Sequence, residues 1–228
     1  MKAGCKVKIC GITNLEDARL AAAEGADYIG VVVDVSFSPR SLTIEQAGKI
    51  FASPYRPTVA LVHQMSFTKL ELLISSLKPF AVQFLSPAAH VIVRAKKIYP
   101  GVQMWQSIHL PPADEQVNRP EIERLVRECS EAGANLIVFD TAAVISGSKR
   151  FGGTGRQSNW QLVQQLVKNC PLPAFLAGGI NPSNAAQAIA FVKPAGIDLC
   201  SGVEALPGQK SLNKLRALMT EVRKENAL

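Results

Sequence analysis

Residues 24–33, EGADYIGVVV, pass from a helix end through a glycine into a strongly apolar run. The same passage recurs as EAGANLIVFD at 131–140 and as PAGIDLCSG at 194–202. Glycine is the expected residue at the end of a helix before such a turn, because it accepts left-handed backbone angles without steric cost. The repeated passage indicates a chain in which helices and strands alternate.

Eight apolar segments, each bounded by turn residues, are predicted to be buried strands. They lie at 6–12, 28–34, 58–63, 81–85, 103–110, 136–142, 174–179 and 196–202. Helical patterns separate most of them, among them 15–26, 43–53, 68–77, 119–134 and 159–170. Strict alternation with strands that are apolar throughout favours a parallel sheet covered by helices. Eight such units predict an α/β fold of the (β/α)8 TIM barrel type, with an open doubly wound sheet as the alternative.

The composition is that of an ordinary globular protein. At 228 residues, with 47% hydrophobic and 19% charged side chains, the chain can bury a substantial core. No Pro-rich or Ser-rich linker divides it, so residues 1–228 are predicted to form a single barrel domain. The longest apolar runs are only strand-length, which argues against a membrane span, and the start has too short an apolar run for a signal peptide.

The cysteines and the charges narrow the setting and the partners. Five scattered cysteines without a C-x-x-C pair, beside only three histidines, indicate neither a disulfide framework nor a zinc site, so we expect a reducing cytoplasm. The net charge of +7 is compatible with nucleic acid, an anionic small molecule or a solvated surface. No basic run or aromatic-interleaved motif accompanies it, and we therefore expect no nucleic-acid partner.

In a barrel, the chemistry belongs at the carboxyl ends of the strands and in the loops that follow them. Cys10 ends the first predicted strand, and its thiol lies either in the barrel mouth or, as free cysteines more often do, packed in the core. Asp140 follows four apolar residues of the sixth strand, where an unpaired carboxylate is costly to bury, and it serves either the chemistry or a turn cap. Across one barrel mouth the two residues would form a proton-transfer pair.

Glycine-rich loops follow the last three predicted strands. FGGTG at 151–155 contains Gly153 and Gly155, FLAGGINPSN at 175–184 contains Gly178 and Gly179, and Ser201 and Gly202 follow the eighth strand. Each loop alone is compatible with a plain turn, but together their backbone N–H groups predict a phosphate site. FGGTG fits neither a P-loop nor a dinucleotide fingerprint. Arg40, in SFSPRSLT, either pairs with a substrate carboxylate or is a solvated surface residue, and His63 and His90 are assigned no role.

The motifs quoted so far belong to longer stretches that together span nearly the whole chain. These are KVKICGIT, LEDARLAAAEGADYIG, SPR, DT followed by FGGTG, PAFLAGGINPSNAAQAI and GIDLCSGVEALPGQKS. They closely resemble the phosphoribosylanthranilate isomerase family of tryptophan biosynthesis. The most specific are KICGIT and LAGGINPSN together with SGVE-x-x-PG-x-K.

The resemblance implies a (β/α)8 barrel that, without a cofactor, catalyses the Amadori rearrangement of N-(5′-phosphoribosyl)anthranilate to 1-(2-carboxyphenylamino)-1-deoxyribulose 5-phosphate. It places the general base at Cys10 and the general acid at Asp140, and it assigns the anthranilate carboxylate to Arg40. It assigns phosphate binding to the loops that contain Gly153, Gly155, Gly178, Gly179, Ser201 and Gly202. The partner implied is this phosphorylated small molecule, for a monomer or a homodimer without a metal.

The sequence departs from the family pattern at two strand ends. The family's QLHG at the end of the fourth strand reads QFLS at 83–86, and the asparagine that usually ends the third strand is replaced in Val62-His63-Gln64. The segment between Asp140 and FGGTG is also long. Two alternatives therefore stand beside the isomerase: a divergent paralogue that acts on another phosphorylated amino-sugar, and a catalytically silent phosphate-binding barrel.

Overall fold

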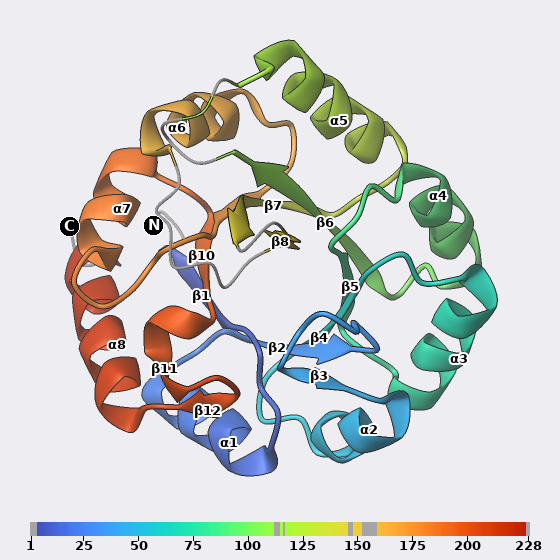
Figure 1. Ribbon diagram of the computed structural model, residues 1–228, viewed down its shortest axis with the longest axis horizontal. Coiled ribbons are helices and arrows are strands. Elements are labelled where there is room, and N and C mark those ends of the chain that lie inside the picture. Colours follow the sequence, from blue (N-terminus) through green and yellow to red (C-terminus); the bar gives the residue numbers. More distant parts are fainter. Residues whose placement is uncertain (1–3, 112–114, 116, 146–147, 152–158, 227–228) are drawn as a thin grey trace.

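A ring of parallel strands surrounded by helices forms the molecule (Figure 1). The structure is a computed structural model that describes residues 4–111, 115, 117–145, 148–151 and 159–226, of which 142–145 and 148–151 are described by their backbone alone. In this part of the chain eight parallel strands build the barrel. They are β1 Lys6–Ile9, β2 Tyr28–Val33, β4 Thr58–Val62, β5 Ala81–Phe84, β6 Gln103–Leu110, β7 Leu136–Ile145, β9 Ala174–Leu176 and β10 Gly196–Leu199.

The ring is closed because β1 pairs with a strand on each side. Ile9 of β1 lies opposite Leu199 of β10 and also opposite Ile29 of β2, and both pairings are parallel. All eight predicted strands are present, and the closure confirms the barrel over the doubly wound sheet. Since every barrel strand runs in the same direction, all the carboxyl ends meet at one mouth.

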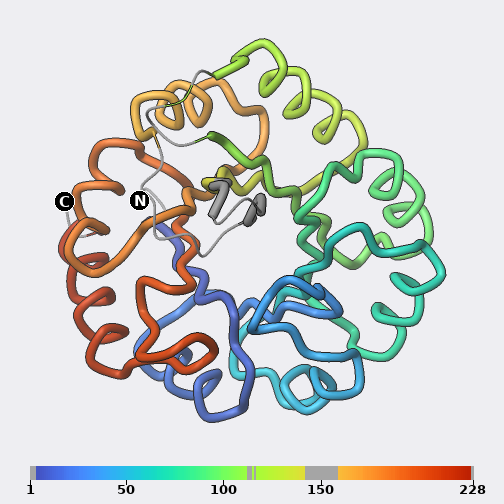
Figure 2. The backbone as a smooth tube through the Cα atoms, in the orientation of Figure 1, coloured from blue at the N-terminus to red at the C-terminus, as the bar shows by residue number. Residues whose placement is uncertain are grey.

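Helices cover the outside of the barrel (Figure 2). Those in the described residues are α1 Leu15–Glu24, α2 Ile44–Ala52, α3 Phe67–Leu77, α4 Ala89–Ile98, α5 Arg119–Glu131, α6 Trp160–Asn169, α7 Ala185–Val192 and α8 Leu212–Asn226. Their ends follow local chemistry: the Asn14 side chain caps the start of α1, and Thr43 and Gln46 form a reciprocal capping box at the start of α2. Gly25 ends α1 in the left-handed conformation, as the sequence predicts. None of these helices is long and apolar enough to cross a membrane.

Two apolar cores result from the alternation of side chains along the strands. The larger core lies between the strands and the helices and contains, for example, Ile9 of β1 and Leu73 of α3. The smaller core fills the inside of the barrel, where the ring of Tyr28 lies 5.2 Å from that of Trp105 and 6.0 Å from that of Phe175. Tyr28 and Trp105 come from the first half of their strands, so this cluster fills the amino-terminal part of the barrel.

Several short elements fall outside the predicted pattern. They are β3 Ser41–Leu42, β8 Ser148–Phe151, the 3-10 turn η1 Ser201–Val203, β11 Glu204–Leu206 and β12 Gln209–Lys210. β8 pairs antiparallel with the end of β7, so the long segment after Asp140 begins as an extension of the strand. β11 and β12 form a hairpin after β10. All of them follow carboxyl ends of barrel strands, and they are too short to leave a periodic pattern in the sequence.

Candidate active site

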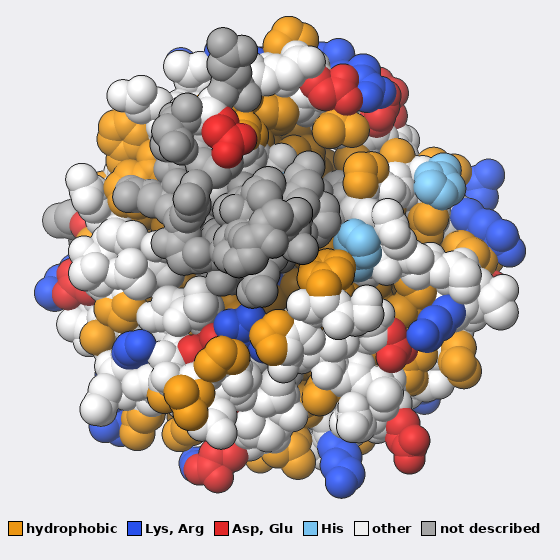
Figure 3. All heavy atoms as spheres, in the orientation of Figure 1, with side chains coloured by type: hydrophobic (Ala, Val, Ile, Leu, Met, Phe, Trp, Pro, Cys, Tyr) orange, Lys and Arg blue, Asp and Glu red, His pale blue; other side chains and the backbone are white. Residues whose placement is uncertain are grey.

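A cavity of about 250 Å³ opens at the carboxyl ends of the barrel strands. Among its lining residues are seven of the predicted site residues: Cys10, Arg40, Asp140, Gly178, Gly179, Ser201 and Gly202. The other two, Gly153 and Gly155, lie outside the described residues. Figure 3 looks along the barrel axis and shows a basic side chain, with acidic and hydrophobic side chains beside it, next to the middle of this face. The fold therefore gathers residues from most of the chain around one cavity.

Cys10 directly follows β1 and is buried in the cavity wall. Its backbone N–H donates to the carbonyl of Leu199 at 2.8 Å, so Cys10 sits beside Cys200 at the end of the adjacent strand. The neighbouring Cys200 thiol, helped by the nearby ammonium of Lys8, lowers the pKa of Cys10 although burial opposes the fall, and the pKa of Cys200 is raised. Cys10 is thus the thiol of the pair that reaches the thiolate form.

Asp140 lies in β7 and lines the same cavity. Burial raises the pKa of Asp140 to about 7, and the negative charge of Asp198 adds to the rise. Its Oδ1 accepts a hydrogen bond from the backbone N–H of Thr141 at 2.7 Å, but β7 continues to Ile145, so this contact lies within the strand and caps no turn. That contact does not explain the raised pKa, because it acts in the opposite direction. Asp140 therefore keeps a proton at a pH where an ordinary aspartate has lost it.

A buried ion pair lies within electrostatic reach of both groups. Lys8 in β1 is fully buried, and its Nζ donates to both carboxylate oxygens of Asp198 in β10, at 2.9 and 2.8 Å. The charges of this pair contribute to the pKa of Cys10 and to that of Asp140. Neither residue of the pair was expected at the site. The available signal was a charged residue inside each of two apolar strands, KVKIC and GIDLC.

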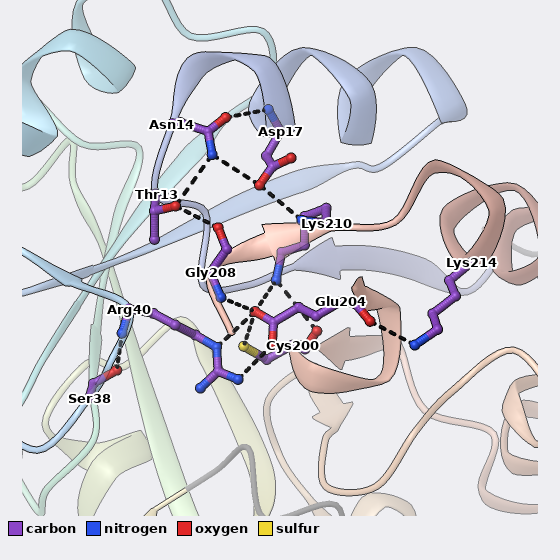
Figure 4. A network of polar contacts seen from close by, with 10 residues as sticks. All are labelled: Thr13, Asn14, Asp17, Ser38, Arg40, Cys200, Glu204, Gly208, Lys210 and Lys214. Atoms are coloured by element: carbon purple, nitrogen blue, oxygen red, sulfur yellow. Dashed lines mark hydrogen bonds and ion pairs between the residues drawn. The ribbon is translucent and has the colours of Figure 1, made fainter. Parts of the chain in front are cut away.

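Arg40 belongs to a buried ionic network and not to the solvated surface (Figure 4). Its side chain is 12% exposed, and its Nε and Nη2 donate to the two carboxylate oxygens of Glu204 at 2.8 and 2.6 Å. The Nζ of Lys210 donates to the same carboxylate at 2.9 Å. Burial opposes the charge of Glu204, but the hydrogen bonds from Arg40 and Lys210 lower its pKa to about 2. Glu204 and Lys210 lie in the motif SGVE-x-x-PG-x-K, but the sequence predicts no role for either residue.

Gly11 brings the side chain of Arg40 close to Cys10. The φ of Gly11 is +72°, and a Cβ at this position would lie 2.6 Å from the Cδ of Arg40 and 2.6 Å from the Sγ of Cys200. Only glycine leaves room for both side chains. The stem of the arginine therefore lies against the chain one residue after Cys10.

Two glycine loops, after β9 and β10, form another side of the cavity. Gly178 and Gly179 have φ values of 87° and 69°. The side-chain amides of Asn181 and Asn184 donate to the carbonyl of Gly179 at 3.3 and 3.0 Å, so the asparagines of LAGGINPSN hold the turn that the glycines make. In the neighbouring loop, a Cβ on Gly202 would lie 2.0 Å from a backbone oxygen of the first loop. The two loops therefore meet through their backbones, with no space for a side chain between them.

The altered ends of β4 and β5 contact each other. The backbone N–H of Gln64 donates to the Oγ of Ser86 at 3.1 Å. From these two strand ends, Gln83 and Leu85 line the cavity, whereas the other altered residues are not among its described lining residues. His63 packs edge-on against an aromatic ring of the loop after β2, with 5.0 Å between ring centroids. Since Gln83 matches the family pattern, Leu85 is the altered residue that reaches the cavity wall.

The chain matches known proteins along nearly its whole length. The family model described as N-(5′-phosphoribosyl)anthranilate (PRA) isomerase matches residues 7–221. The N-(5′-phosphoribosyl)anthranilate isomerase of Methanocella arvoryzae is 36% identical over 222 residues, which cover 96% of this chain and 98% of the relative. The enzyme of the same name from Aquifex aeolicus is 32% identical over 220 residues, which cover 96% of this chain and 99% of the relative.

Solved structures show the same likeness. The N-(5′-phosphoribosyl)anthranilate isomerase of Pyrococcus furiosus superposes with a TM-score of 0.79 at 25% identity, over 96% of this chain and 99% of that chain. The phosphoribosyl anthranilate isomerase of Thermotoga maritima gives 0.77 at 28% identity, over 96% and 99%. The fold and the cavity define a (β/α)8-barrel enzyme with its site at the carboxyl ends of the strands. The chain belongs to the N-(5′-phosphoribosyl)anthranilate isomerase family of tryptophan biosynthesis, whose members interconvert an aldose and a ketose.

Proposed function

We propose that this protein is an active N-(5′-phosphoribosyl)anthranilate isomerase in which Asp140 is the general acid and Cys10 the general base. The observation that carries the proposal is a pair of opposite pKa shifts in one cavity, upward for Asp140 and downward for Cys10. An acid that keeps its proton and a thiol that gives its proton up are what two successive proton transfers near neutral pH require.

The rearrangement uses these two groups in turn. Asp140 gives its proton to the furanose ring oxygen, the bond from that oxygen to C1 breaks, and the nitrogen lone pair forms an iminium ion. The Cys10 thiolate then removes the proton from C2, and the electron pair of that C–H bond produces the enolamine, which tautomerises to the ketone. Asp140 loses one proton and Cys10 gains one, so a single proton exchange resets the site. No electrons enter or leave, and the chemistry therefore requires no redox cofactor.

The substrate's two anionic ends are assigned to different loops. Arg40, which lines the cavity and is held by Glu204, is proposed to bind the anthranilate carboxylate. The loops with Gly178, Gly179, Ser201 and Gly202 are proposed to bind the phosphate through backbone N–H groups. Gly153 and Gly155 are assigned to the same phosphate from the sequence alone.

The two alternatives have less support. A divergent paralogue is suggested by the altered ends of β4 and β5, but of the changed residues in the described part only Leu85 lies on the cavity wall. There it adds to an apolar wall with Val32 and Leu61, which suits the aromatic ring of anthranilate. A silent phosphate-binding barrel requires neither pKa shift, so the states of Cys10 and Asp140 favour an enzyme.

A reducing cytoplasm is the proposed setting of the enzyme, as a monomer or a homodimer. All five cysteines are free thiols in the structure. Cys10 must stay unoxidised to form the thiolate that acts as a base, and a reducing compartment protects it from oxidation.

Turnover of the substrate tests both roles. Phosphoribosylanthranilate generated in situ should lose its anthranilate-type fluorescence when the protein is added. Cys10→Ala and Asp140→Asn should each lower kcat/KM by about 10²–10⁴-fold. Cys129→Ala changes a buried thiol of α5 in the outer core and should keep the wild-type rate. A folded wild type without turnover, or a fully active Cys10 or Asp140 variant, would contradict the proposal.

A further inference from the structure

Glu204 and Lys210 are buried charged residues that the mechanism above does not use. Neither is among the described residues that line the cavity. Even so, the carboxylate of Glu204 accepts hydrogen bonds from Arg40, from Lys210 and from the backbone N–H of Gly208, the last at 3.2 Å. Figure 4 shows this carboxylate between the two cationic side chains. Glu204 therefore controls how the guanidinium is oriented in the cavity wall.

A guanidinium has two edges that can each bind a carboxylate with two parallel hydrogen bonds. Glu204 occupies the edge of Arg40 that is formed by Nε and Nη2. The other edge is formed by Nη1 and the second N–H of Nη2. Its Nη1 makes no hydrogen bond with any residue that the structure describes, and Arg40 itself lines the cavity. The geometry leaves a matched edge for a second carboxylate.

The charges of the network also favour an anion. Arg40 and Lys210 carry two positive charges, and Glu204 carries a single negative one. The side chain of Arg40 is 12% exposed, that of Lys210 0% and that of Glu204 4%. Beside them, Asp17 binds the backbone N–H of Lys210, and Lys214 binds the backbone carbonyl of Glu204. Because Asp17 and Lys214 carry opposite charges, they leave the net charge of the network unchanged. One positive charge remains, and it attracts an anion into the cavity, whether a thiolate or a substrate carboxylate.

We propose that Glu204 is a positioning residue, which holds Arg40 by one edge so that the other edge receives the ortho carboxylate of the anthranilate ring. Lys210 keeps Glu204 ionised and contributes the positive charge that the substrate carboxylate neutralises. The inference rests on the proposed function, in which Arg40 binds that carboxylate. It makes the network a device for specificity, because a substrate without the carboxylate gains nothing from the free edge.

The β11–β12 hairpin carries Glu204 and Lys210 and is tied to the start of α1. The Oγ of Thr13 donates to the carbonyl of Gly208 at 2.7 Å, and the backbone N–H of Lys210 donates to the carboxylate of Asp17 at 3.0 Å (Figure 4). The side-chain amide of Asn14 donates to the same carboxylate at 3.1 Å. These bonds keep the hairpin in place before a substrate arrives, which lowers the entropic cost of ordering Arg40 on binding.

The test compares Glu204→Gln with the wild type on phosphoribosylanthranilate and on phosphoribosylaniline, which lacks the carboxylate. Glutamine keeps the size of the side chain but replaces one of the two accepting oxygens by an NH2 group, so at most one of the two parallel hydrogen bonds with Arg40 remains. The variant makes the network more positive by one charge, which alone would favour the anion, but misplacing a binding group by about 1 Å costs up to about a hundredfold. We therefore expect the lost orientation to dominate, with KM for the carboxylated substrate rising about tenfold and kcat nearly unchanged. KM for phosphoribosylaniline should not change. Glu16→Gln is the control, because Glu16 is 73% exposed on α1.

Glu204→Asp keeps the negative charge and serves as a second variant if Glu204→Gln does not fold. Its shorter side chain should raise KM for phosphoribosylanthranilate in the same direction by a smaller factor. Equal increases for both substrates, or no increase for the carboxylated one, would overturn the inference, because Glu204 would then act on the fold as a whole or not at all.

Binding of anthranilate alone separates this inference from the proposed function. The affinity of each protein for anthranilate can be measured by the fluorescence of the ligand, without any turnover. Suppose that the wild type converts neither substrate and still binds anthranilate more tightly than Glu204→Gln does. In that case the proposed function is wrong, but the inference that Glu204 positions Arg40 for a carboxylate is supported. Equal affinity of the two proteins for anthranilate overturns the inference, whatever the turnover.

Discussion

Two buried ionic groups in this barrel differ in how their charges balance. Lys8 and Asp198 form a closed pair, in which one ammonium donates to both oxygens of one carboxylate. Arg40 and Lys210 share the single carboxylate of Glu204 and leave one positive charge over. Both groups act on the pKa values of neighbouring thiols, but the first has no charge left for a ligand, whereas the second is suited to attract an anion.

The difference follows from the place of each group in the barrel. Lys8 lies inside the ring of strands with its side chain 0% exposed, where an unbalanced charge is most costly. Asp198 also lines the cavity, but Lys8 already balances its charge, whereas Arg40, in the loop after β2, lines the cavity where a ligand can complete the balance. A balanced buried pair indicates a group that tunes the site, and an unbalanced one beside a cavity indicates a group that binds.

Lys8→Met should give the largest effect on stability. The change leaves the Asp198 carboxylate buried without its partner, and removing one partner of a buried pair costs about 3–5 kcal/mol. The free energy of unfolding, measured by urea titration at pH 7, should fall by this amount. A loss below about 1 kcal/mol would mean that Asp198 is satisfied without Lys8, and the pair would not be closed in the sense described above.

Lys210→Met should cost less, about 1.5–3 kcal/mol, because Arg40 still pairs with Glu204 and only the hydrogen bonds of one charged group are lost. The net charge of the network falls to zero, so the affinity for anthranilate should fall as well. Urea unfolding measures the first effect and a fluorescence titration measures the second. Unchanged affinity for anthranilate would show that the surplus charge has no part in binding.

The pH profile of kcat/KM should show how the balanced pair acts on Asp140. Asp140 must be protonated to act as an acid, and its pKa is about 7, so loss of this proton should oppose activity above pH 7, and kcat/KM should fall with rising pH once Cys10 is fully ionised. Asp198→Asn removes a negative charge that raises this pKa, and the fall should therefore begin at lower pH. If the profile of the variant coincides with that of the wild type, Asp198 does not tune the acid.

Lys6→Met should give the smallest effect and is the matched control for Lys8→Met. Lys6 lies two residues earlier on the same face of β1, and its ion pair with Asp27, at 2.9 Å, is 49% and 30% exposed. An exposed pair of this kind contributes less than about 1 kcal/mol. A loss of stability as large as that of Lys8→Met would assign the effect to β1 itself and not to the burial of the charge.

Regular elements could be predicted from the sequence because their burial repeats along the chain. TVALV at 58–62 is apolar throughout and forms β4, and the capping box of Thr43 and Gln46 marks the start of α2. β3 and β12 could not be predicted in this way. Each is two residues long, and each pairs through hydrogen bonds with an already folded neighbour.

The site was predictable where a residue type is unusual in its own segment. Cys10 before Gly11, Asp140 after four apolar residues and the paired glycines at 178–179 stand out in this way, and all of them line the cavity. Glu204 and Lys210 were not predicted, because their meaning depends on Arg40, which lies 164 residues before Glu204.

By itself, the sequence determined what depends on neighbouring residues: the alternation of helices and strands, the turns at glycine, and the choice of Asp140, Cys10 and Arg40 as candidate site residues. Only the tertiary structure decided which of them are close enough to act on each other. Lys8 and Asp198 are 190 residues apart in the chain and 2.8 Å apart in space. Charge balance, burial and pKa depend on such distances, which the closure of the barrel sets and no local stretch of sequence records.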